Sequence, residues 1–281
     1  MPAAVPPVVS RFAPAPTGHL HLGHVVNAIH VWGVTRARGG RVLLRIEDHD
    51  RQRSRPEYER AILEDLAWLG FEADEPLTRQ SERGAIYEDA LARLRACGLV
   101  YACACSRADV AASNAEPGTE LRYAGTCANA GLAEQPDRGL RVRIDPTVER
   151  FVDLRHGAQE QQPSAQCGDV LVRDRKGNWT YQFAATVDDF VQGVTLVIRG
   201  DDVLPSTGRQ IQIARRLGRD APPAFLHHAL IMKSPTRKLS KSDGDTGVRE
   251  LRARGWTPSQ VREHAARLAG LPDGYADRWL A

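Results

Sequence analysis

The chain has 281 residues, of which 42% are hydrophobic and 26% charged. These values are typical of a globular protein and exclude a disordered one, and the length suits one substantial α/β domain with a smaller lobe. The net charge of +3 at pH 7 is too small to indicate nucleic-acid binding by itself. No apolar run approaches the roughly 18 residues of a membrane span, and the start, MPAAVPP, has no signal-peptide pattern. We therefore expect a cytoplasmic protein that does not contact membranes, and nothing in the sequence requires more than a monomer.

The first part of the chain alternates between strand and helix patterns. Apolar runs predict strands at 8–13, 41–48 and 99–103, and helical spacing predicts helices from about His24 to Gly39, over 54–70 and over 82–96. Ser54 and Glu57 form a capping box around Pro56, and Gly70 ends that helix. This order of elements is typical of a doubly wound α/β sheet.

Residues 104–168 interrupt the alternation and predict an inserted lobe. Residues 111–139 have no strong period, and 141–145 alternate like a half-exposed strand. The α/β rhythm then returns with the following elements: a hairpin of 169–174 and 179–183, a helix at 184–190, a strand at 194–199, a helix at 207–217, the run 225–233, a basic loop and two short helices. The last helix has a capping box of Thr257 and Gln260, with Pro258 at its first position and Gly270 as its stop. We expect four units, at 1–103, 104–168, 169–230 and 231–281.

Eight arginines lie within one stretch of 25 residues: Arg36, Arg38, Arg41, Arg45, Arg51, Arg53, Arg55 and Arg60. A basic cluster of this kind suits a polyanionic partner, but solvated helix faces of an arginine-rich chain give the same pattern. The sequence leaves both interpretations open.

A pair of histidines at the start of the first helix predicts a phosphate site. His21, Gly23 and His24 follow a Pro/Gly loop directly after the first strand. The N-terminus of a helix presents unpaired N–H groups and the positive end of its dipole, which suits a triphosphate, and a glycine lets a nucleotide approach the backbone closely. The alternative is a histidine pair that only caps the helix.

Two lysines late in the chain offer a second set of cations for phosphates. Lys238, Ser240 and Lys241 lie in a loop between the last strand and a helix, where ammonium groups can meet charge that develops during a reaction. A solvated turn is the alternative for this segment alone. We predict that the histidine pair and the lysine loop converge over one nucleotide.

The five cysteines are an odd number, which argues against a disulfide framework and leaves metal binding open. Cys103, Cys105, Tyr123 and Cys127 offer three thiolates and one phenolate for a tetrahedral Zn²⁺ site. The alternative is three buried cysteines and a packing tyrosine. The other two cysteines are expected not to be ligands: Cys97 and Cys167.

Several segments together resemble the catalytic domain of class I glutamyl-tRNA synthetases over nearly the whole chain. They are Arg11–Gly18 (RFAPAPTG), His21–His24 (HLGH), Arg45–Asp48 (RIED), Val187–Asp189 (VDD), Gly193–Thr195 (GVT), Ile198–Gly200 (IRG) and Lys238–Ser242 (KLSKS). The resemblance implies an α/β class I synthetase fold, with a Rossmann-type parallel sheet, an inserted small zinc-binding lobe and a short helical C-terminal segment. The four predicted units then correspond to the two halves of a catalytic domain around the inserted lobe, and a lysine loop with a stem-contact-like segment.

Within that family the chain is most similar to truncated paralogues that attach glutamate to the queuosine base of tRNA(Asp). Only 39 residues follow Ser242, too few for a separate anticodon-binding region, and the Cys-x-Cys…Tyr-x-x-x-Cys pattern is a feature of these paralogues. The resemblance therefore implies one structural Zn²⁺ ion, together with Mg²⁺ that accompanies ATP.

The resemblance also implies a glutamate pocket lined by Arg11, Ala13, Ala15, Glu47, Tyr181 and Arg199. Charge supports part of this set, because a substrate carboxylate requires a fixed cation such as Arg11 or Arg199, and Glu47 can hold the substrate ammonium. The alternatives are surface ion pairs for the arginines and a core position for Tyr181. Ala15 replaces the family's usual serine, and Ala185 replaces a frequent asparagine, so we expect weakened glutamate binding.

The implied reaction activates L-glutamate with ATP without tRNA and passes it to queuosine in the anticodon loop of tRNA(Asp). His21, His24, Lys238 and Lys241 are the implied catalytic residues, and Gly23 and Ser240 complete the ATP site. One alternative is a minimal glutamyl-tRNA synthetase acting on a tRNA 3′ end. Another is a non-catalytic tRNA-binding module, although such a protein has no use for groups that stabilise pyrophosphate. A small nucleotidyltransferase shares only the histidine motif.

Overall fold

The computed structural model describes residues 7–113, 120–234, 237–238 and 247–277. The α-helices in these ranges are α1 (Leu22–Arg36), α2 (Pro56–Trp68), α3 (Gly84–Ala96), α4 (Arg107–Ala112), α5 (Pro163–Gln166), α6 (Tyr181–Val191), α7 (Thr207–Arg216), α8 (Val248–Ala253) and α9 (Pro258–Leu268). None of the helices in this part of the chain has the length and apolarity needed to cross a membrane.

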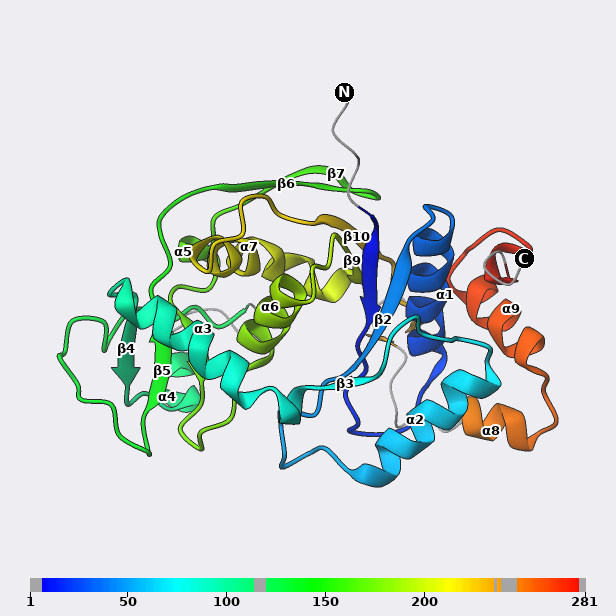
Figure 1. The fold of residues 1–281 in the computed structure, drawn as a ribbon, viewed down its shortest axis with the longest axis horizontal. Coiled ribbons are helices and arrows are strands. Elements are labelled where there is room, and N and C mark those ends of the chain that lie inside the picture. Colours follow the sequence, from blue (N-terminus) through cyan, green and yellow to red (C-terminus); the bar gives the residue numbers. More distant parts are fainter. Residues whose placement is uncertain (1–6, 114–119, 235–236, 239–246, 278–281) are drawn as a thin grey trace.

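The centre of the molecule is a twisted sheet whose strands come from both halves of the chain (Figure 1). Its strands are β1 (Val9–Phe12), β2 (Arg41–Ile46), β3 (Thr78–Arg79), β6 (Glu149–Asp153), β7 (Gly157–Gln161), β9 (Leu196–Gly200) and β10 (Ala224–His228). β2 pairs in parallel with β1 and β3, and β10 pairs in parallel with β9 and β6. The two groups meet where β1 lies beside β9, because the Thr195 N–H donates to the Val9 carbonyl at 2.9 Å.

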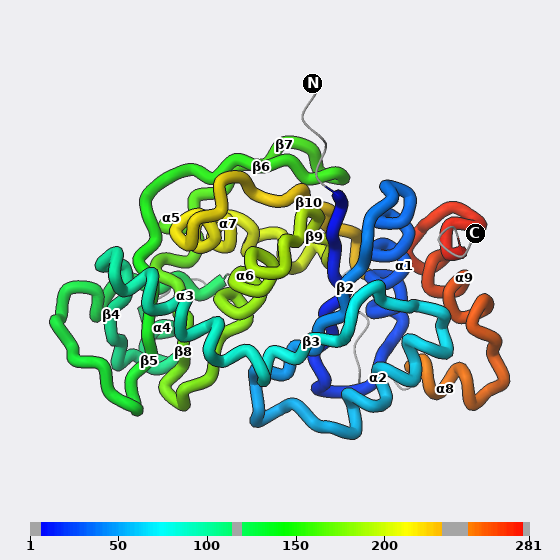
Figure 2. Tube along the Cα trace, in the orientation of Figure 1, coloured from blue at the N-terminus to red at the C-terminus, as the bar shows by residue number. Residues whose placement is uncertain are grey.

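The strand order across this join is β3-β2-β1-β9-β10-β6, with β7 antiparallel at the edge. In such a sheet the order in which strands are added reverses between β1 and β9. Ligands bind at the carboxyl ends of the strands on either side of this switch point. Helices α1 and α9 lie on one side of the sheet and α6 and α7 on the other (Figure 2). The predicted α/β architecture with a parallel sheet is confirmed.

Most helix boundaries follow the local signals in the sequence. The capping box of Thr257 and Gln260 forms as predicted, and Gly70 follows α2 with a positive φ of 79°. The capping box predicted at Ser54 is wrong. Helix α2 starts one residue later than that box requires, with Pro56 at its first position and Arg55 as an N-cap without a side-chain bond, so Ser54 lies outside the turn.

A small antiparallel sheet lies beside the central one, at the left of Figure 1. It consists of β4 (Val100–Cys103), β5 (Gly139–Val142) and β8 (Val170–Arg173), with β5 in the middle. The strand predicted at 99–103 therefore does not extend the parallel sheet. The middle position also buries all four residues of β5, including Arg141, which corrects the expected half-exposed strand. The division of the chain into four units stays a prediction.

One further sequence interpretation is wrong, and one hairpin was missed, each for an identifiable reason. The predicted hairpin partner at 179–183 makes only one isolated bridge, between Trp179 and Arg173, because α6 already begins at Tyr181. The β6–β7 hairpin was not predicted. In β6 the inward positions include the acidic Glu149 and Asp153, whereas Val152 is 64% exposed, so the apolar pattern is inverted and hides the strand.

Candidate active site

The histidine pair lies at the N-terminus of α1, next to the carboxyl end of β1. His21 is the N-cap residue, and its Nδ1 accepts a hydrogen bond from the Gly23 N–H at 3.1 Å. His24 Nδ1 accepts from the His21 N–H at 3.1 Å, and the two ring centroids are 3.9 Å apart. The helix start therefore has a capping box made of two imidazoles.

These two hydrogen bonds fix the tautomer of both rings. A ring nitrogen that accepts a hydrogen bond carries no proton, so a neutral imidazole in this geometry holds its proton on Nε2. His21 and His24 each present an Nε2–H donor at the positive end of the α1 dipole. Capping uses Nδ1 of each ring, so it is compatible with a phosphate contact at Nε2.

Gly23 has a different local reason to be glycine from the one expected. A Cβ atom at this position would lie 2.8 Å from Cε1 and 3.0 Å from Nδ1 of the His21 ring. Any larger residue must displace this imidazole. The absence of a side chain at Gly23 therefore makes room for the cap itself.

Arg11 and Arg45 share one buried carboxylate, that of Asp189 in α6. The Nε of Arg11 and the NH2 of Arg45 each lie 2.9 Å from Asp189 Oδ1, and all three side chains are nearly inaccessible to solvent. Burial raises the pKa of Asp189, but the two guanidinium charges outweigh it and hold the pKa below its usual range. Arg11 therefore already has an anionic partner within the protein, which it shares with Arg45.

The neighbouring Asp188 anchors a second set of donors. Its oxygens accept from Arg83 Nε at 2.5 Å, Tyr87 Oη at 2.8 Å and Gln80 Nε2 at 2.8 Å. The sequence interpretation gave Asp188 and Asp189 no role of their own, although two adjacent acidic residues in an otherwise apolar helix signal a buried ionic network. This network joins α6 to β1, β2 and α3.

Glu47 follows β2 at the same end of the sheet and is 8% exposed. Its N–H donates to the Pro14 carbonyl at 3.0 Å, and its Oε1 lies 3.6 Å from Arg45 NH2. Burial raises the pKa of Glu47, and the Arg45 charge opposes this only in part. A cationic group beside this carboxylate would offset its desolvation.

Arg199, near the end of β9, is a buried guanidinium held by neutral groups. Its Nε donates to His227 Nε2 at 3.0 Å, NH1 to Gln210 Oε1 at 2.6 Å and NH2 to Thr207 Oγ1 at 2.9 Å. No carboxylate in the described part of the chain forms an ion pair with it. Burial, and to a smaller extent the Arg11 charge, lowers the pKa of Arg199, while its hydrogen bond with Tyr181 opposes the shift. Arg199 therefore has no carboxylate within ion-pair distance among the described residues, and the more distant Asp189 charge favours its protonated form.

His227 and Asp153 form a hydrogen-bonded chain that ends at Arg199. His227 is fully buried in β10, and its Nδ1 lies 2.7 Å from Oδ2 of Asp153 at the end of β6. Burial and the Arg199 charge lower the pKa of His227 to about 4. The neutral ring donates from Nδ1 to Asp153 and accepts from Arg199 at Nε2. The sequence analysis missed both residues, because they come from separate strands.

The remaining predicted pocket residues lie around this network. Tyr181 is the first residue of α6, and Ala13 and Ala15 lie partly exposed in the loop after β1. Ala185 is buried within α6. Arg11, Glu47, Tyr181 and Arg199 are thus brought together by the sheet and α6.

The lysine motif is described only in part. The backbone of Lys238 pairs with that of Met232 in the short hairpin of β11 (Met232–Ser234) and β12 (Arg237–Lys238), whereas Ser240 and Lys241 lie outside the described residues. The description resumes at Gly247, which forms a β-bridge with His21, and the Val248 N–H donates to the Leu20 carbonyl at 3.0 Å. The segment that contains the motif therefore ends beside the histidine pair.

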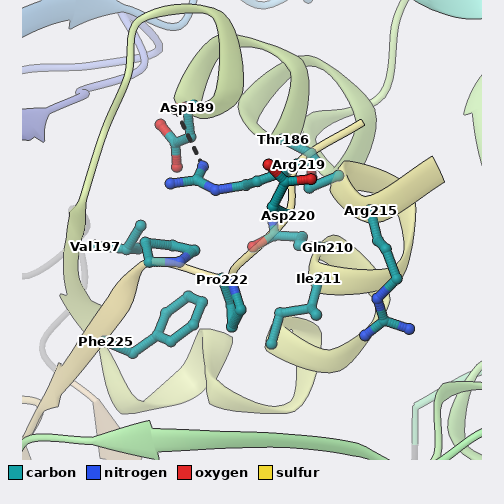
Figure 3. Close-up of a pocket in the computed structure, with 12 residues that line it drawn as sticks. Thr186, Asp189, Val197, Gln210, Ile211, Arg215, Arg219, Asp220, Pro222 and Phe225 are labelled. Carbon is teal, nitrogen blue, oxygen red and sulfur yellow. Dashed lines mark hydrogen bonds between the residues drawn. The ribbon is translucent and has the colours of Figure 1, made fainter. Parts of the chain in front are cut away.

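A cavity of about 40 Å³ lies between α6, α7 and the strands β9 and β10 (Figure 3). Val197, Ile211 and Phe225 give it an apolar lining, and Arg219 donates to the backbone carbonyl of Asp189 at 3.3 Å. It is too small for an amino acid or a nucleotide. No residue of the predicted glutamate or ATP sites lines it, so it is not the substrate pocket.

A cysteine cluster is formed by the end of β4, the turn between β4 and α4, and the loop that follows α4. The Sγ atoms of Cys103, Cys105 and Cys127 all lie within 4.8 Å of one another, and Cys105 and Cys127 are 3.6 Å apart. This separation is far beyond a disulfide bond of about 2 Å and close to the roughly 3.8 Å between two thiolates on one tetrahedral zinc ion. Cys167 and the exposed Cys97 are not part of the cluster.

Tyr123 completes this donor set. Its Oη lies 3.5 Å from Cys103 Sγ and accepts from the Cys127 N–H at 2.8 Å, which aims the phenol at the cluster. Arg141 stacks on the Tyr123 ring at 3.6 Å, and its Nε donates to Cys103 Sγ at 3.3 Å. Three thiols and one phenol supported by a cation fit a divalent ion that prefers sulfur ligands.

Comparison with known proteins bears on both sites. Residues 7–275 match the family model for the catalytic domain of class I tRNA synthetases (E and Q). A glutamyl-Q tRNA(Asp) synthetase of Rhodobacter capsulatus is 39% identical over 94% of this chain and 100% of its own length. One from Burkholderia cenocepacia is 43% identical over 94% of this chain and 89% of its own length.

Two solved structures are also similar. A glutamate tRNA ligase from Elizabethkingia meningosepticum, in complex with its amino acid, has a TM-score of 0.77 and 27% identity, and covers 94% of this chain. A glutamate-tRNA synthetase from Elizabethkingia anophelis has a TM-score of 0.72 and 28% identity over 89% of this chain. The present chain spans 60% and 54% of those two chains, respectively.

Proposed function

This chain belongs to the class I tRNA synthetases (E and Q), among relatives that are glutamyl-Q tRNA(Asp) synthetases, and on that premise we propose that it is a ligase of the same specificity. It activates L-glutamate with ATP in the absence of RNA. It then transfers the glutamyl group to the queuosine base in the anticodon loop of tRNA(Asp), acting as a monomer.

The observation that carries this proposal is the state of Arg199. Arg199 is a buried guanidinium whose hydrogen-bond partners are neutral and which has no carboxylate within ion-pair distance among the described residues. A ligand anion is favourable beside such a group, and its planar fork of donors suits a carboxylate. Arg11 differs, because it already has an anionic partner in Asp189. We therefore assign the substrate's side-chain carboxylate to Arg199 with Tyr181, and give Arg11 a supporting role in the wall of the pocket.

The other end of the amino acid meets Glu47. Its carboxylate is buried beside Arg45, and the substrate ammonium would supply the second positive charge that such a group favours. Ala13 and Ala15 line the loop between this position and the histidine pair. With alanine at positions 15 and 185, two polar contacts to glutamate are absent, so we expect a higher KM than serine and asparagine would give.

The histidine pair and the lysine loop form the proposed ATP site. His21 and His24 donate from Nε2 to the phosphates, and Gly23 keeps the His21 ring in place. Lys241 precedes Gly247 by six residues, so a fully extended chain keeps it within roughly 22 Å of the His21 bridge. This limit supports the proposal that Lys241, with Lys238 and Ser240, reaches the same phosphates.

The reaction proceeds in two steps. An oxygen of the glutamate α-carboxylate attacks the α-phosphorus of ATP, the bond to pyrophosphate breaks, and a glutamyl adenylate remains. A hydroxyl of the queuosine cyclopentene ring then attacks the acyl carbon and loses its proton, and AMP leaves. The protein positions the reactants and stabilises the negative charge that develops on the phosphates, and it forms no covalent bond with them.

Two metal ions accompany this proposal. We assign Cys103, Cys105, Tyr123 and Cys127 as the ligands of one structural Zn²⁺ ion, because four protein ligands leave no position open for a substrate. Mg²⁺ enters with ATP and neutralises phosphate charge.

The proposal is tested by ATP–pyrophosphate exchange with glutamate and no RNA, followed by transfer of radiolabelled glutamate to tRNA pools with and without queuosine. We expect exchange without RNA, and transfer only to the queuosine-containing pool. Lys241→Ala should slow exchange by about 100-fold or more, with Arg150→Ala on the outer hairpin as a control. Absence of exchange would contradict the proposal, and labelling of a tRNA 3′ end would instead indicate a minimal glutamyl-tRNA synthetase.

A further inference from the structure

The loop at residues 49–55 lies at the mouth of the proposed active site. It follows Glu47 and β2, and the Arg55 N–H donates to the Pro16 carbonyl at 3.0 Å. Pro16 belongs to the loop that leads from β1 to the histidine pair. Side chains on 49–55 therefore border the same opening through which an acceptor would have to approach the activated glutamate.

The arginine cluster noted in the sequence separates into two groups in the structure. Some members are neutralised within the protein: Arg36 by Asp74, Arg41 by Glu75, Arg45 by Asp189 and Arg53 by Asp50. Arg51 and Arg55 are exposed and form no ion pair with the described residues. Arg55 NH1 donates only to the backbone carbonyls of Gln52 and Ser54. Two cations at the mouth thus have no carboxylate partner in the described part of the chain.

A surface groove on the small antiparallel sheet is linked to this loop by a hydrogen bond. Lys176 Nζ donates to Gln52 Oε1 at 3.0 Å, which connects the mouth to the turn after β8. The groove next to Lys176 has a volume of about 470 Å³ and is lined by residues of 134–140 and 173–177. Its basic residues are Arg138, Arg173 and Lys176, of which Arg173 is paired with Glu88 at 3.0 Å.

The carboxylates of this groove are already engaged. Glu134 accepts both Nε and NH2 of Arg95, at 2.9 and 2.8 Å. Asp174 accepts the backbone N–H groups of Lys176 and Asn178, each at 2.8 Å. Arg138, by contrast, donates to the Ala133 carbonyl and forms no ion pair with the described residues. Asp174 accepts only neutral N–H donors and keeps its negative charge, but Arg138 and Lys176 outnumber it, so a small positive excess adds to the charge of Arg51 and Arg55.

We propose that Arg51, Arg55, Arg138 and Lys176, hereafter the basic groove, bind the backbone phosphates of the RNA strand that carries the acceptor nucleoside. This inference rests on the proposed function and adds the path that the RNA takes, from the mouth between β1 and β2 across β8. A loop nucleoside can enter a crevice only if the flanking phosphates are held outside it. Exposed arginines and lysines at the rim serve this purpose.

Contacts between protein cations and RNA phosphates make RNA affinity depend on salt concentration, a dependence that glutamate activation without RNA lacks. Each phosphate neutralised by a protein cation releases condensed counterions, and for single-stranded RNA the slope of log affinity against log salt concentration changes by about 0.7 per contact. Activation of glutamate without RNA requires none of the four side chains. Their substitution should therefore separate the two steps of the reaction.

The experiment compares Arg51→Glu, Arg138→Glu and Lys176→Glu with Arg150→Glu in the full-length protein. Arg150 is the matched control, because it is also exposed and lies on the β6–β7 hairpin, paired with Glu160 at 2.7 Å. Each variant is assayed for RNA-independent ATP–pyrophosphate exchange and for glutamyl transfer to queuosine-containing tRNA(Asp) over a series of salt concentrations.

We expect the three groove variants to keep wild-type exchange, to raise the KM for tRNA about fivefold or more, and to have a salt slope smaller by about 0.7. Arg150→Glu should leave all of these values unchanged. Groove variants that match Arg150→Glu in KM and salt slope would overturn the inference. Failure of the wild-type protein in exchange or transfer would instead contradict the proposed function, so the two failures are distinguishable.

Discussion

The guanidinium of Arg199 donates from Nε to Nε2 of His227 at 3.0 Å, and both side chains are buried. This bond fixes the plane of the guanidinium, because His227 is itself held by Asp153 at 2.7 Å. The orientation of Arg199, the proposed contact for a substrate carboxylate, therefore depends on residues of β10 and β6.

Replacing His227 by alanine should weaken glutamate binding without affecting ATP. A hydrogen bond to a buried charged group is worth about 1.5–3 kcal/mol, so we expect the KM for glutamate in exchange to rise at least tenfold. His227→Gln keeps an oxygen that can accept from Arg199 and should restore most of the loss. Equal KM values for the alanine and glutamine variants would show that the side chain serves only to fill space.

The same histidine makes stability depend on pH in a defined direction. The pKa of His227 is lowered from 6.5 in the unfolded chain to about 4, so between these values the unfolded chain binds a proton that the folded protein does not. The free energy of unfolding therefore has its full value above pH 6.5 and falls as the pH decreases toward 4. His227→Gln should show a smaller drop in urea midpoint between pH 7.5 and pH 5 than the wild type. The other buried histidines are the same in both proteins, so the difference between the two drops reports His227. An identical pH dependence would count against this assignment.

Gly23→Ala tests the capping box of two imidazoles. The new Cβ would lie 2.8 Å from the His21 ring, so the ring must turn away and its Nε2–H leaves the phosphate site. We expect kcat for exchange to fall by about 10- to 100-fold with a small change in the KM for glutamate. Gly84→Ala is the matched control, since Gly84 also starts a helix and nothing lies within 4 Å of the position that its new methyl group would take.

Local signals in the sequence were sufficient for elements whose pattern and burial agree. Helix α9 has its capping box and β2 its apolar run, and both form as predicted. The β6–β7 hairpin could not be predicted, because Glu149 and Asp153 occupy inward positions that only distant partners make favourable. Glu149 is paired with Arg215, and Asp153 with His227.

The candidate site shows the same division. Short motifs identified the residue types, including Arg11, Glu47 and Arg199, but not which arginine is neutralised. That distinction depends on Asp189, which lies 178 positions from Arg11 in the chain. Periodicity and spacing describe neighbours in sequence, whereas the charge state of a pocket depends on groups that the tertiary fold brings together. The resemblance to a family supplied the expected roles of these residues. The hydrogen bonds and ion pairs then distinguish Arg11, which contacts Asp189, from Arg199, which does not.

The cysteine cluster gives the last prediction. If Cys103, Cys105, Tyr123 and Cys127 hold one Zn²⁺ ion, the purified protein should contain about one equivalent of zinc, measured by elemental analysis. Cys105→Ser should lose the metal and lower the unfolding midpoint by roughly 5 °C or more, because metal binding contributes directly to folding stability. Cys97→Ser is the matched control, since Cys97 is exposed and lies outside the cluster. A Cys105→Ser protein with wild-type zinc content and stability would contradict the site, and loss of glutamate exchange at low temperature would contradict its purely structural role.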